Sequence, residues 1–387
     1  MNIGIDARWI FKETSGIGVY TRELIRHLAK IDRHNKYVLF FQDADLKEKM
    51  QAELASFSAE NFTARLLNFG LFSIKNQLAM PKIIRELNLD VFHSTNYMIP
   101  LRAFPRNHQG RTAGIITIHD LIPLASPEST PRSLKTRLFP VYRRLMEEVT
   151  ARSRLIITVS EFSRNDIIAR LHCRPEHVLA IPEGVAERFQ PARQNQSSSN
   201  ERIFRRKKII LWVGRQDPYK NLTGLIEAFS MLRKNYRGSI ELRLVGPADS
   251  RYPEASRRVI ELGLADAVSW VGHISENELV GEYQNANVFI LPSYYEGFGL
   301  PVLEAMACGT PVICSNKSSL PEICGSAAMQ VDPKDIPGIC DALHRVLTDS
   351  RLAGDLAAHG LQHAARFNWQ ETARRTVLAY EKAALTK

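Results

Sequence analysis

The sequence predicts an α/β protein of two doubly wound, Rossmann-like domains, each built around a parallel sheet. Short apolar runs rich in β-branched residues alternate with stretches of helical period, which is typical of successive βαβ units. The chain has 387 residues, more than one hydrophobic core usually organises, so two domains are expected. We predict an N-terminal domain over 1–188, a polar, serine-rich linker over 189–206, a C-terminal domain over 207–368 and a final helix over 369–387.

The composition is that of a water-soluble globular protein, with 44% hydrophobic and 24% charged residues. No apolar run approaches the roughly 20 residues that span a bilayer, and the first residues enter a strand without the layout of a signal peptide. The five cysteines form no Cys-x-x-Cys pair, which argues against a zinc site or a disulfide framework and fits a reducing compartment. We therefore expect a cytoplasmic protein.

The net charge of +10 is compatible with nucleic acid, anionic lipid or phosphorylated substrates as partners. No nucleic-acid-binding signature accompanies the charge, so we expect no nucleic-acid partner. Basic residues gather at 131–154 among leucines and valines at helical spacing, and they include Arg132, Lys135, Arg137, Arg143 and Arg144. This pattern predicts an amphipathic helix whose basic face either rests on an anionic membrane surface or is simply solvated.

The first strand candidate, at 1–9, leads into a glycine loop and an amphipathic helix from about Val19 to Ile31. Strand, glycine loop and helix begin a mononucleotide-binding unit, in which Gly16 and Gly18 let a substrate approach the backbone closely. The loop has no third glycine at the spacing of a dinucleotide-binding fingerprint, so a nicotinamide cofactor is not indicated.

Two further polar pairs follow strands in the first half. Asp43 and Asp45 form an Asp-x-Asp pair of the kind found in metal sites, but it directly precedes a helical stretch, and we interpret it as a helix cap. His119 and Asp120 end a β-branched strand, where polar residues of parallel sheets usually belong to a ligand site. The alternative is a capping aspartate and a histidine satisfied by its neighbours.

The most informative stretch is VFILPSYYEGFGLPVLEAMACGTPVICS at 288–315, which predicts strand, loop, short helix and strand. Glu296 lies on the loop and Glu304 on the first turns of the helix, both at the ligand-binding edge of a parallel sheet. Three residues between them would offer main-chain N–H groups to an anion, namely Phe298, Gly299 and Leu300. The site suits a ligand with both hydroxyls and phosphates; the alternative is a buried βαβ unit with two surface glutamates.

Two cations follow the strand candidate at 208–213, in the run VGRQDPYKN. Arg215 offers forked hydrogen bonds and Lys220 a compact charge, and such a pair beyond a strand end is suited to a diphosphate. The alternative is a pair of exposed cations without a ligand.

These motifs resemble those of the retaining glycosyltransferases of family 4, which have the GT-B fold of two Rossmann-like domains facing each other across a cleft. The run EGFGLPVLEAMACGTPV is similar to the family signature, VGRQDPYKN is similar to its diphosphate site, and HDLIPL is typical of its bacterial, mannosyltransferase-like branch. The resemblance extends to the last helix, which crosses back to the first domain in this fold. The chain departs from many relatives at Ser15, where they have glycine, and at Glu183, where they have asparagine.

The resemblance implies transfer of a hexose from a nucleoside-diphosphate sugar to a hydroxyl, with retention at the anomeric carbon and without a metal. Arg215 and Lys220 would stabilise the departing diphosphate, and Glu296 would contact the sugar hydroxyls. Glu304 would bind the ribose, and His119 would lie beside the transferred sugar and the acceptor. The remaining donor contacts would come from Gly16, Gly18, Phe298, Gly299 and Leu300 near the phosphates, and from Gly272, His273 and Ile274 around the base.

GDP-mannose is the expected donor, because the HDLIPL branch is rich in mannosyltransferases; GDP-rhamnose and UDP-hexoses stay open. The expected acceptor is a lipid-linked or growing bacterial polysaccharide such as an O-antigen, with the basic helices resting on the inner membrane. Other classes remain: a GT-B epimerase would not need the block with two glutamates, a sugar phosphorylase would need a lysine for pyridoxal phosphate, and a basic nucleic-acid-binding protein would turn over no sugar nucleotide.

Overall fold

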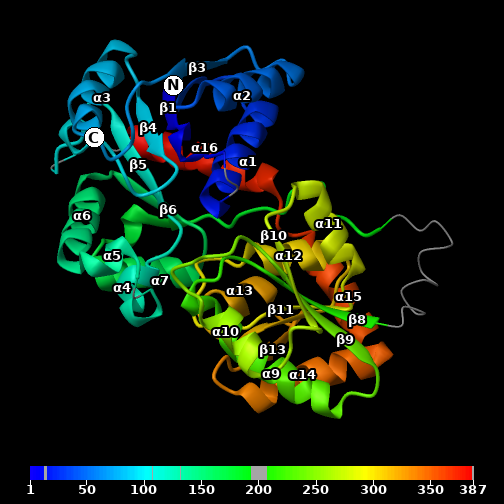
Figure 1. The fold of residues 1–387 in the computed structure, drawn as a ribbon. Coiled ribbons are helices and arrows are strands. Elements are labelled where there is room, and N and C mark those ends of the chain that lie inside the picture. The colour runs from blue at the N-terminus through cyan, green and yellow to red at the C-terminus, as the bar shows by residue number, and fades with distance from the viewer. Residues whose placement is uncertain (13–14, 107, 131, 193–206, 386–387) are drawn as a thin grey trace. The chain divides into compact units, whose positions relative to one another are not determined.

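The computed structural model describes residues 1–12, 15–106, 108–130, 132–192 and 207–385 (Figure 1). By its internal contacts the chain divides into two compact units. Unit 1 comprises Met1–Ala125, Lys135–Gly184 and Asn368–Lys387; unit 2 comprises Ser126–Leu134 and Val185–Phe367. The predicted linker at 189–206 lies largely outside the described residues. Across the described ranges, no helix is long and apolar enough to cross a bilayer.

Unit 1 is built around a seven-stranded parallel sheet with the order β3-β2-β1-β4-β5-β6-β7. Its strands are β1 (Asn2–Asp6), β2 (Lys36–Phe41), β3 (Phe62–Leu66), β4 (Val91–Ser94), β5 (Ala113–Ile118), β6 (Leu155–Thr158) and β7 (Val178–Ala180). The strand order reverses between β1 and β4, where Ile5 lies opposite His93. Strands β4, β5 and β6 are buried at every position, as expected when helices cover both faces of a parallel sheet.

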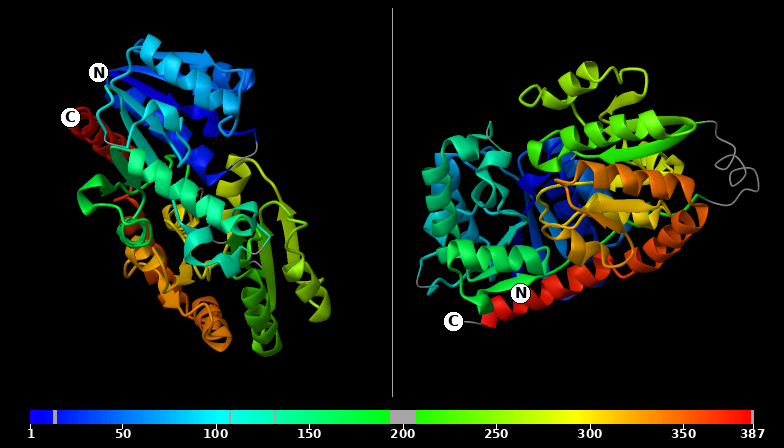
Figure 2. Two further views of the ribbon diagram at one scale, coloured as in Figure 1. Left: turned by 90° about the vertical axis from the view of Figure 1, so that its left-hand side faces the viewer. Right: turned by 90° about the horizontal axis from the view of Figure 1, so that it is seen from below.

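Helices flank the sheet of unit 1, and several of them begin at side-chain caps that the sequence supplies, such as Ser15, Ser73 and Ser160. The helices are α1 (Gly16–Ile31), α2 (Ala44–Ser56), α3 (Ile74–Glu86), α4 (Ile122–Ala125), α6 (Phe139–Arg152), α7 (Glu161–Leu171) and α16 (Trp369–Leu385). Asp43 caps α2 by accepting a hydrogen bond from the Leu46 N–H, which confirms the interpretation of the Asp-x-Asp pair as a cap. Helix α16 packs against α1, β4 and β5. Figure 2 shows it passing the segment of β7, where Arg375 donates to the Ala180 carbonyl.

Unit 2 has a six-stranded parallel sheet with the order β10-β9-β8-β11-β12-β13. The strands are β8 (Lys207–Val213), β9 (Ser239–Val245), β10 (Val268–Gly272), β11 (Val288–Leu291), β12 (Val312–Ser315) and β13 (Met329–Val331). The order reverses between β8 and β11, where Val288 pairs with Ile210. The predicted fold class, two doubly wound Rossmann-like parallel sheets, is confirmed.

Two sets of helices flank this sheet. In one set, α9 (Leu222–Asn235) contacts both α10 (Glu254–Glu261) and α14 (Ile336–Thr348). In the other set, α12 (Leu300–Ala307) contacts α11 (Glu276–Asn285), α15 (Ser350–Ala364) and the short α13 (Leu320–Cys324). Right-handed crossovers that run in opposite directions from the reversal point place their helices on opposite faces. The carboxyl ends of β8 and β11 therefore lie where open α/β sheets form their ligand-binding crevice.

The basic stretch differs from the single amphipathic helix that we predicted. It forms two helices, α5 (Leu134–Arg137) and α6, and Pro140 stands in the first turn of the second. Proline is well tolerated there and poorly tolerated further inside a helix, so α6 begins anew. Leu138 and Val141 are exposed, because α6 buries a different side through residues such as Met146.

Gly184 offers a test of how unit 1 is held together. A Cβ at this position would lie 2.1 Å from the Trp369 nitrogen and 2.5 Å from the Asn368 carbonyl carbon. Because these are backbone atoms that cannot turn aside, Gly184→Ala should lower the free energy of unfolding by about 1–3 kcal/mol. Gly354→Ala is the control: a Cβ there meets nothing within 4 Å, and the change should raise stability by about 1 kcal/mol. Equal urea midpoints for the two variants would contradict this account.

Candidate active site

The predicted donor residues of unit 2 gather at the point where its strand order reverses. Arg215 and Lys220 follow β8, the latter at the end of the 3₁₀ turn Pro218–Lys220, and Glu296 lies on the loop after β11. In open α/β sheets this crevice, at the carboxyl ends of the strands, is where ligands bind. The sheet thus places a cation and a carboxylate from distant parts of the sequence at one edge.

Lys220 and Glu296 form a buried ion pair, with the ammonium nitrogen 2.7 Å from Oε1 and side-chain exposures of 11% and 9%. The Ser293 hydroxyl donates a second hydrogen bond, also of 2.7 Å, to the same oxygen. A buried charge costs several kcal/mol in desolvation unless it is paired and hydrogen-bonded. The pair therefore fixes both side chains before any ligand arrives.

The loop that bears Glu296 is held by hydrogen bonds from the segment before α13. The Glu296 N–H donates to the Ser318 hydroxyl at 2.9 Å, and the Ser319 hydroxyl contacts the carbonyls of Glu296 and Phe298, each at 2.9 Å. Gly299 completes the turn with φ of +111°, and a Cβ there would lie 2.5 Å from the Leu320 side chain. Only glycine fits this position without strain.

Helix α12 begins directly after this turn. The Val302 N–H bonds to the Gly299 carbonyl, so the N–H groups of Gly299 and Leu300 precede the first turn of intrahelical bonds. Together with the positive end of the helix dipole, they make the start of α12 a candidate anion-binding position.

Glu304 is buried in α12, and its Oε2 accepts a hydrogen bond of 2.8 Å from the Tyr283 hydroxyl. Burial, and then the Glu304 carboxylate, raise the pKa of Tyr283 well above its ordinary value, so the hydroxyl remains a donor. Tyr283 lies on α11, and the sequence reasoning missed it as it missed Ser293 and Ser318. The tyrosine orients the carboxylate that we assign to a ribose.

The other predicted donor residues of unit 2 lie at the same edge of the sheet. Arg215 has a side chain that is 60% exposed, and its Nε lies 3.2 Å from the Asp217 carboxylate. Gly272 ends β10 with φ of +75°, and its carbonyl accepts a hydrogen bond from the Gly246 N–H. His273 is exposed and Ile274 is half-buried. The carbonyl of Gly272 is therefore already occupied within the protein.

His119 belongs to unit 1 and follows β5. Its Nε2 lies 3.0 Å from the Thr95 carbonyl, its Nδ1 lies 3.4 Å from the Glu183 carboxylate, and the Tyr20 ring meets it edge-on with centroids 4.7 Å apart. Asp120 accepts a hydrogen bond from the Ile122 N–H, the capping role that we left as the alternative. His119 is thus tightly enclosed at the carboxyl edge of its sheet.

The glycine loop of unit 1 is more helical than we predicted. Gly16 and Gly18 both lie inside the first turn of α1, and the Ser15 hydroxyl accepts the Gly18 N–H at 3.1 Å. The serine that replaces a glycine of many relatives therefore acts as the helix cap. Of the preceding loop, residues 13 and 14 lie outside the described residues.

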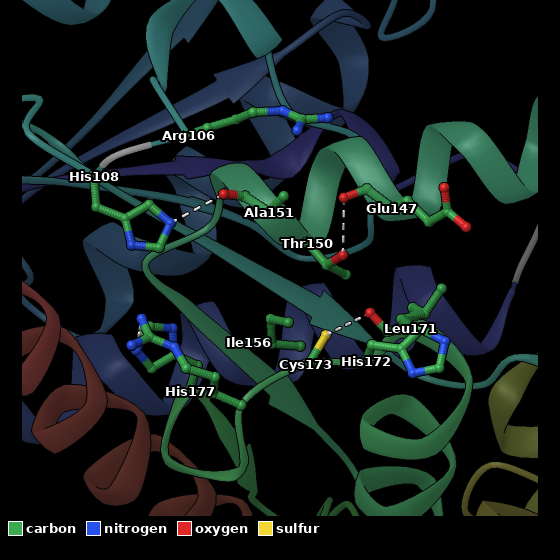
Figure 3. A pocket seen from close by; sticks show the side chains of 11 residues that line it. Arg106, His108, Glu147, Thr150, Ala151, Ile156, Leu171, His172, Cys173 and His177 are labelled. Atoms are coloured by element: carbon green, nitrogen blue, oxygen red, sulfur yellow. Dashed lines mark hydrogen bonds between the residues drawn. The ribbon is translucent and has the colours of Figure 1, made fainter.

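A separate cavity of about 240 Å³ lies in unit 1, lined by Arg106, His108, Cys173 and His177 among others (Figure 3). Its walls come from the end of α6, the end of α7 and the turn before β7, so it borders the amino ends of the strands. None of the predicted site residues lines it. No group of three or more His, Cys, Asp or Glu within the described ranges is arranged to hold a metal ion.

Comparison with known proteins gives matches along the chain. The family described as "Glycosyltransferase Family 4" matches residues 14–188, and "Glycosyl transferases group 1" matches residues 193–363. The chain is 29% identical to O-antigen chain mannosyltransferase B of Escherichia coli, over 95% of this chain and 96% of that protein. It is 34% identical to the MMP alpha-(1->4)-mannosyltransferase of Mycolicibacterium hassiacum, over 59% of this chain and 54% of that protein.

A solved structure, the sucrose-phosphate synthase of Thermosynechococcus elongatus, has the same fold, with a TM-score of 0.77 and 22% identity over 98% of both chains. Taken with the two family matches, this shows that the chain belongs to the family 4 glycosyltransferases of GT-B fold. The resemblance inferred from the motifs is confirmed, and so is glycosyltransferase activity.

The buried ion pair makes a prediction about stability. Lys220→Met leaves the Glu296 carboxylate buried without its cation, which should lower the free energy of unfolding by about 3 kcal/mol. The double variant Lys220→Met/Glu296→Gln removes both charges and should unfold at a higher urea concentration than the single variant. Lys334→Met, at an exposed position of the same unit, should match the wild type. A double variant less stable than Lys220→Met alone would show that the two side chains are not coupled in this way.

Proposed function

We propose that this protein is a retaining mannosyltransferase that moves mannose from GDP-mannose to a hydroxyl of a lipid-linked or growing bacterial polysaccharide, such as an O-antigen. The main support is the Lys220–Glu296 pair beside the start of α12, at the reversal point of the second sheet. A cation, a carboxylate and the main-chain N–H groups at the start of a helix match the diphosphate and the hydroxyls of a sugar nucleotide. The mannosyltransferase relatives support the choice of sugar.

In this proposal the protein stabilises the leaving group. Cleavage of the anomeric bond builds negative charge on the diphosphate, and Arg215, Lys220 and the N–H groups at the start of α12 would balance it. Preorganised donors of this kind usually supply the largest part of a rate enhancement. These donors would also neutralise the charge that a divalent ion neutralises in other enzymes, so we propose a reaction without a metal or other cofactor.

The two glutamates would hold the donor on either side of the diphosphate. Glu296 would accept hydrogen bonds from hydroxyls of the transferred sugar, close to the carbon on which positive charge develops. Glu304, oriented by Tyr283, would accept from the ribose hydroxyls. The loop at Gly272, His273 and Ile274 would contact the base through its backbone, so the sequence of this loop does not distinguish GDP from UDP. GDP-rhamnose and UDP-hexoses are the alternatives that the donor assay separates.

The donor assay offers GDP-mannose, GDP-rhamnose and UDP-glucose in turn, with a synthetic mannosyl lipid as the acceptor probe. We expect GDP-mannose to be consumed and the new linkage to have the α configuration of the donor by proton NMR. Arg215→Ala should lower kcat by about 10²-fold because one donor to the leaving group is lost. Arg233→Ala, whose guanidinium pairs with Asp266 on the surface of the same unit, is the matched control and should retain full activity. A β-linked product, or turnover of UDP-glucose alone, would overturn the proposal.

We further propose that unit 1 associates with an anionic membrane at the cytoplasmic face, through α6 and the residues before it. Leu138 and Val141 lie three residues apart and are 50% and 65% exposed, beside the exposed Arg137 and Arg144. Several of the basic residues have partners in the chain: Arg143 pairs with Glu147, Arg144 pairs with Glu148, and Lys135 lies over the rings of Tyr97 and Tyr142. Arg132, in unit 2, pairs with Glu254. Exposed apolar side chains flanked by cations are typical of a surface that enters the lipid headgroup region.

Leu138→Glu/Val141→Glu tests this surface, because two carboxylates should be repelled by anionic lipid and cannot enter the headgroup region. We expect at least about tenfold weaker sedimentation with phosphatidylglycerol vesicles, with unchanged transfer to a water-soluble acceptor. Ile260→Glu/Leu378→Glu makes the same chemical change at two exposed positions elsewhere and should bind like the wild type. Equal vesicle binding by the two double variants would show that α6 does not contribute to membrane binding.

A further inference from the structure

Two cysteines of unit 2 flank, in sequence, the segment that holds the Glu296 loop. Cys314 lies in β12 and Cys324 is the last residue of α13; both are free thiols, and both side chains are buried. The Cys314 thiol donates a hydrogen bond of 3.4 Å to the sulfur of Cys324. Because a disulfide bond is about 2.0 Å long, an approach of roughly 1.4 Å would join the two sulfurs.

The two thiols differ in their hydrogen bonds. The Cys324 sulfur accepts from the Cys314 thiol and from the Gln330 amide at 3.5 Å, and its own hydrogen points to the Gly325 carbonyl. The bond from Cys314 lowers the pKa of Cys324, although burial opposes this effect. The same bond, and then burial, raise the pKa of Cys314 well above its ordinary value. Cys324 therefore forms the thiolate, the reactive state of a cysteine, more readily than Cys314.

The positions of the two sulfurs in the fold also differ. Cys324 ends a helix of five residues, and the chain then turns at Gly325, with φ of +53°, into the exposed Ser326. Gln330, which donates to the Cys324 sulfur, is also exposed. Cys314 lies in a strand that pairs with β11 on one side and β13 on the other. Local opening of the last turn of α13 uncovers Cys324 to solvent, while Cys314 stays within the sheet.

We propose that Cys314 and Cys324 are a redox-sensitive pair that hydrogen peroxide converts to a disulfide, and that this bond restrains the loop that bears Glu296. The Cys324 thiolate attacks one peroxide oxygen, the O–O bond breaks, and a sulfenic acid and hydroxide form; the hydroxide takes up a proton and becomes water. The Cys314 sulfur then attacks the sulfenic sulfur, and the hydroxyl group leaves as water with the Cys314 proton. Two thiols and one peroxide thus give one disulfide and two waters, and the sulfurs lose the two electrons that the peroxide gains.

The restraint on the loop follows from the residues that the disulfide encloses. Ser318 and Ser319 lie between the two cysteines, and their hydroxyls bond to the Glu296 N–H and to the carbonyls of Glu296 and Phe298. The Glu296 N–H becomes free only when this segment moves away. A ring closed over 314–324 has fewer open conformations than the reduced chain, so the disulfide should make such openings rarer.

Peptide mapping of the full chain tests the disulfide directly. The protein is treated with hydrogen peroxide, unfolded in the presence of an alkylating agent that blocks the remaining thiols, and digested with trypsin. Trypsin cuts after Lys317 and so separates the two cysteines into the peptides 259–317 and 318–334. We expect the two peptides to be joined after oxidation and to separate when dithiothreitol is added.

Single variants identify the sulfurs. The peptide 259–317 also contains Cys308, so Cys308→Ser should still give the joined product and Cys314→Ser should not. Cys340→Ser, which removes the half-buried thiol of α14 in the same unit, is the matched control and should give the joined product in full. Wild-type protein that yields no joined peptides, or a joined product in Cys314→Ser, would overturn the proposal. Cys314→Ala decides the matter if the serine variant fails to fold, because it adds no hydroxyl to a buried place.

Amide hydrogen exchange, measured by mass spectrometry, tests the restraint. Oxidation should slow exchange in peptic peptides that cover 293–299 by at least roughly threefold. In Cys314→Ala/Cys324→Ala, peroxide should leave this exchange unchanged, which also controls for oxidation of methionines. Equal or faster exchange in the disulfide form would refute the restraint. Neither readout uses a sugar nucleotide, so failure of the proposed function in the donor assay would leave both results decisive.

Discussion

The ion pair between Lys220 and Glu296 is the interaction on which the rest of the candidate site depends. Each charge alone would be costly to bury, and together they neutralise each other while Ser293 satisfies the shared oxygen. The pair links the turn after β8 to the loop after β11, which lie on either side of the reversal in strand order. In the proposed reaction, a diphosphate bound there would meet groups whose positions are already set, so little reorganisation would be needed.

In unit 1, as in unit 2, a polar side chain after a strand end is fixed by contacts with neighbouring residues, although the side chains differ. The sheet of unit 1 also reverses order at the centre, and His119 extends from the carboxyl end of β5 into contacts with Thr95 and Glu183. In both units, rigid parallel strands end in short loops whose polar side chains are fixed by one charged partner and one neutral partner. This chain therefore obtains precise placement of these side chains from loops, because each loop is tied by side-chain contacts to a neighbouring segment of its unit.

Much of this architecture could be predicted from the sequence because its signals are local. The strand at Val288–Leu291 and the cap at Asp43 depend on a few adjacent residues, and the structure has both as predicted. The charged residues of the donor site could be found because their motifs are specific. The basic stretch was predicted as one amphipathic helix, and Pro140 in the first turn of α6 divides it into two helices.

What the sequence could not supply are the partners of the site residues. Tyr283 is 21 residues from Glu304 and Ser318 is 22 residues from Glu296. Neither belongs to a recognisable motif, because a hydroxyl at the right place in the fold can come from any strand end or helix. Glu183 was noticed only as a departure from many relatives, and its proximity to His119 became visible once β5 and the segment after β7 were placed in one unit.

The central claim is that the diphosphate of a sugar nucleotide binds at the reversal point of the second sheet. A crystal structure of the protein with GDP tests it most directly. The account predicts phosphate oxygens within hydrogen-bonding distance of the Lys220 ammonium and of the N–H groups of Gly299 and Leu300, with the ribose against Glu304. GDP bound elsewhere on unit 2, or held without contact to Lys220 and the start of α12, would contradict it.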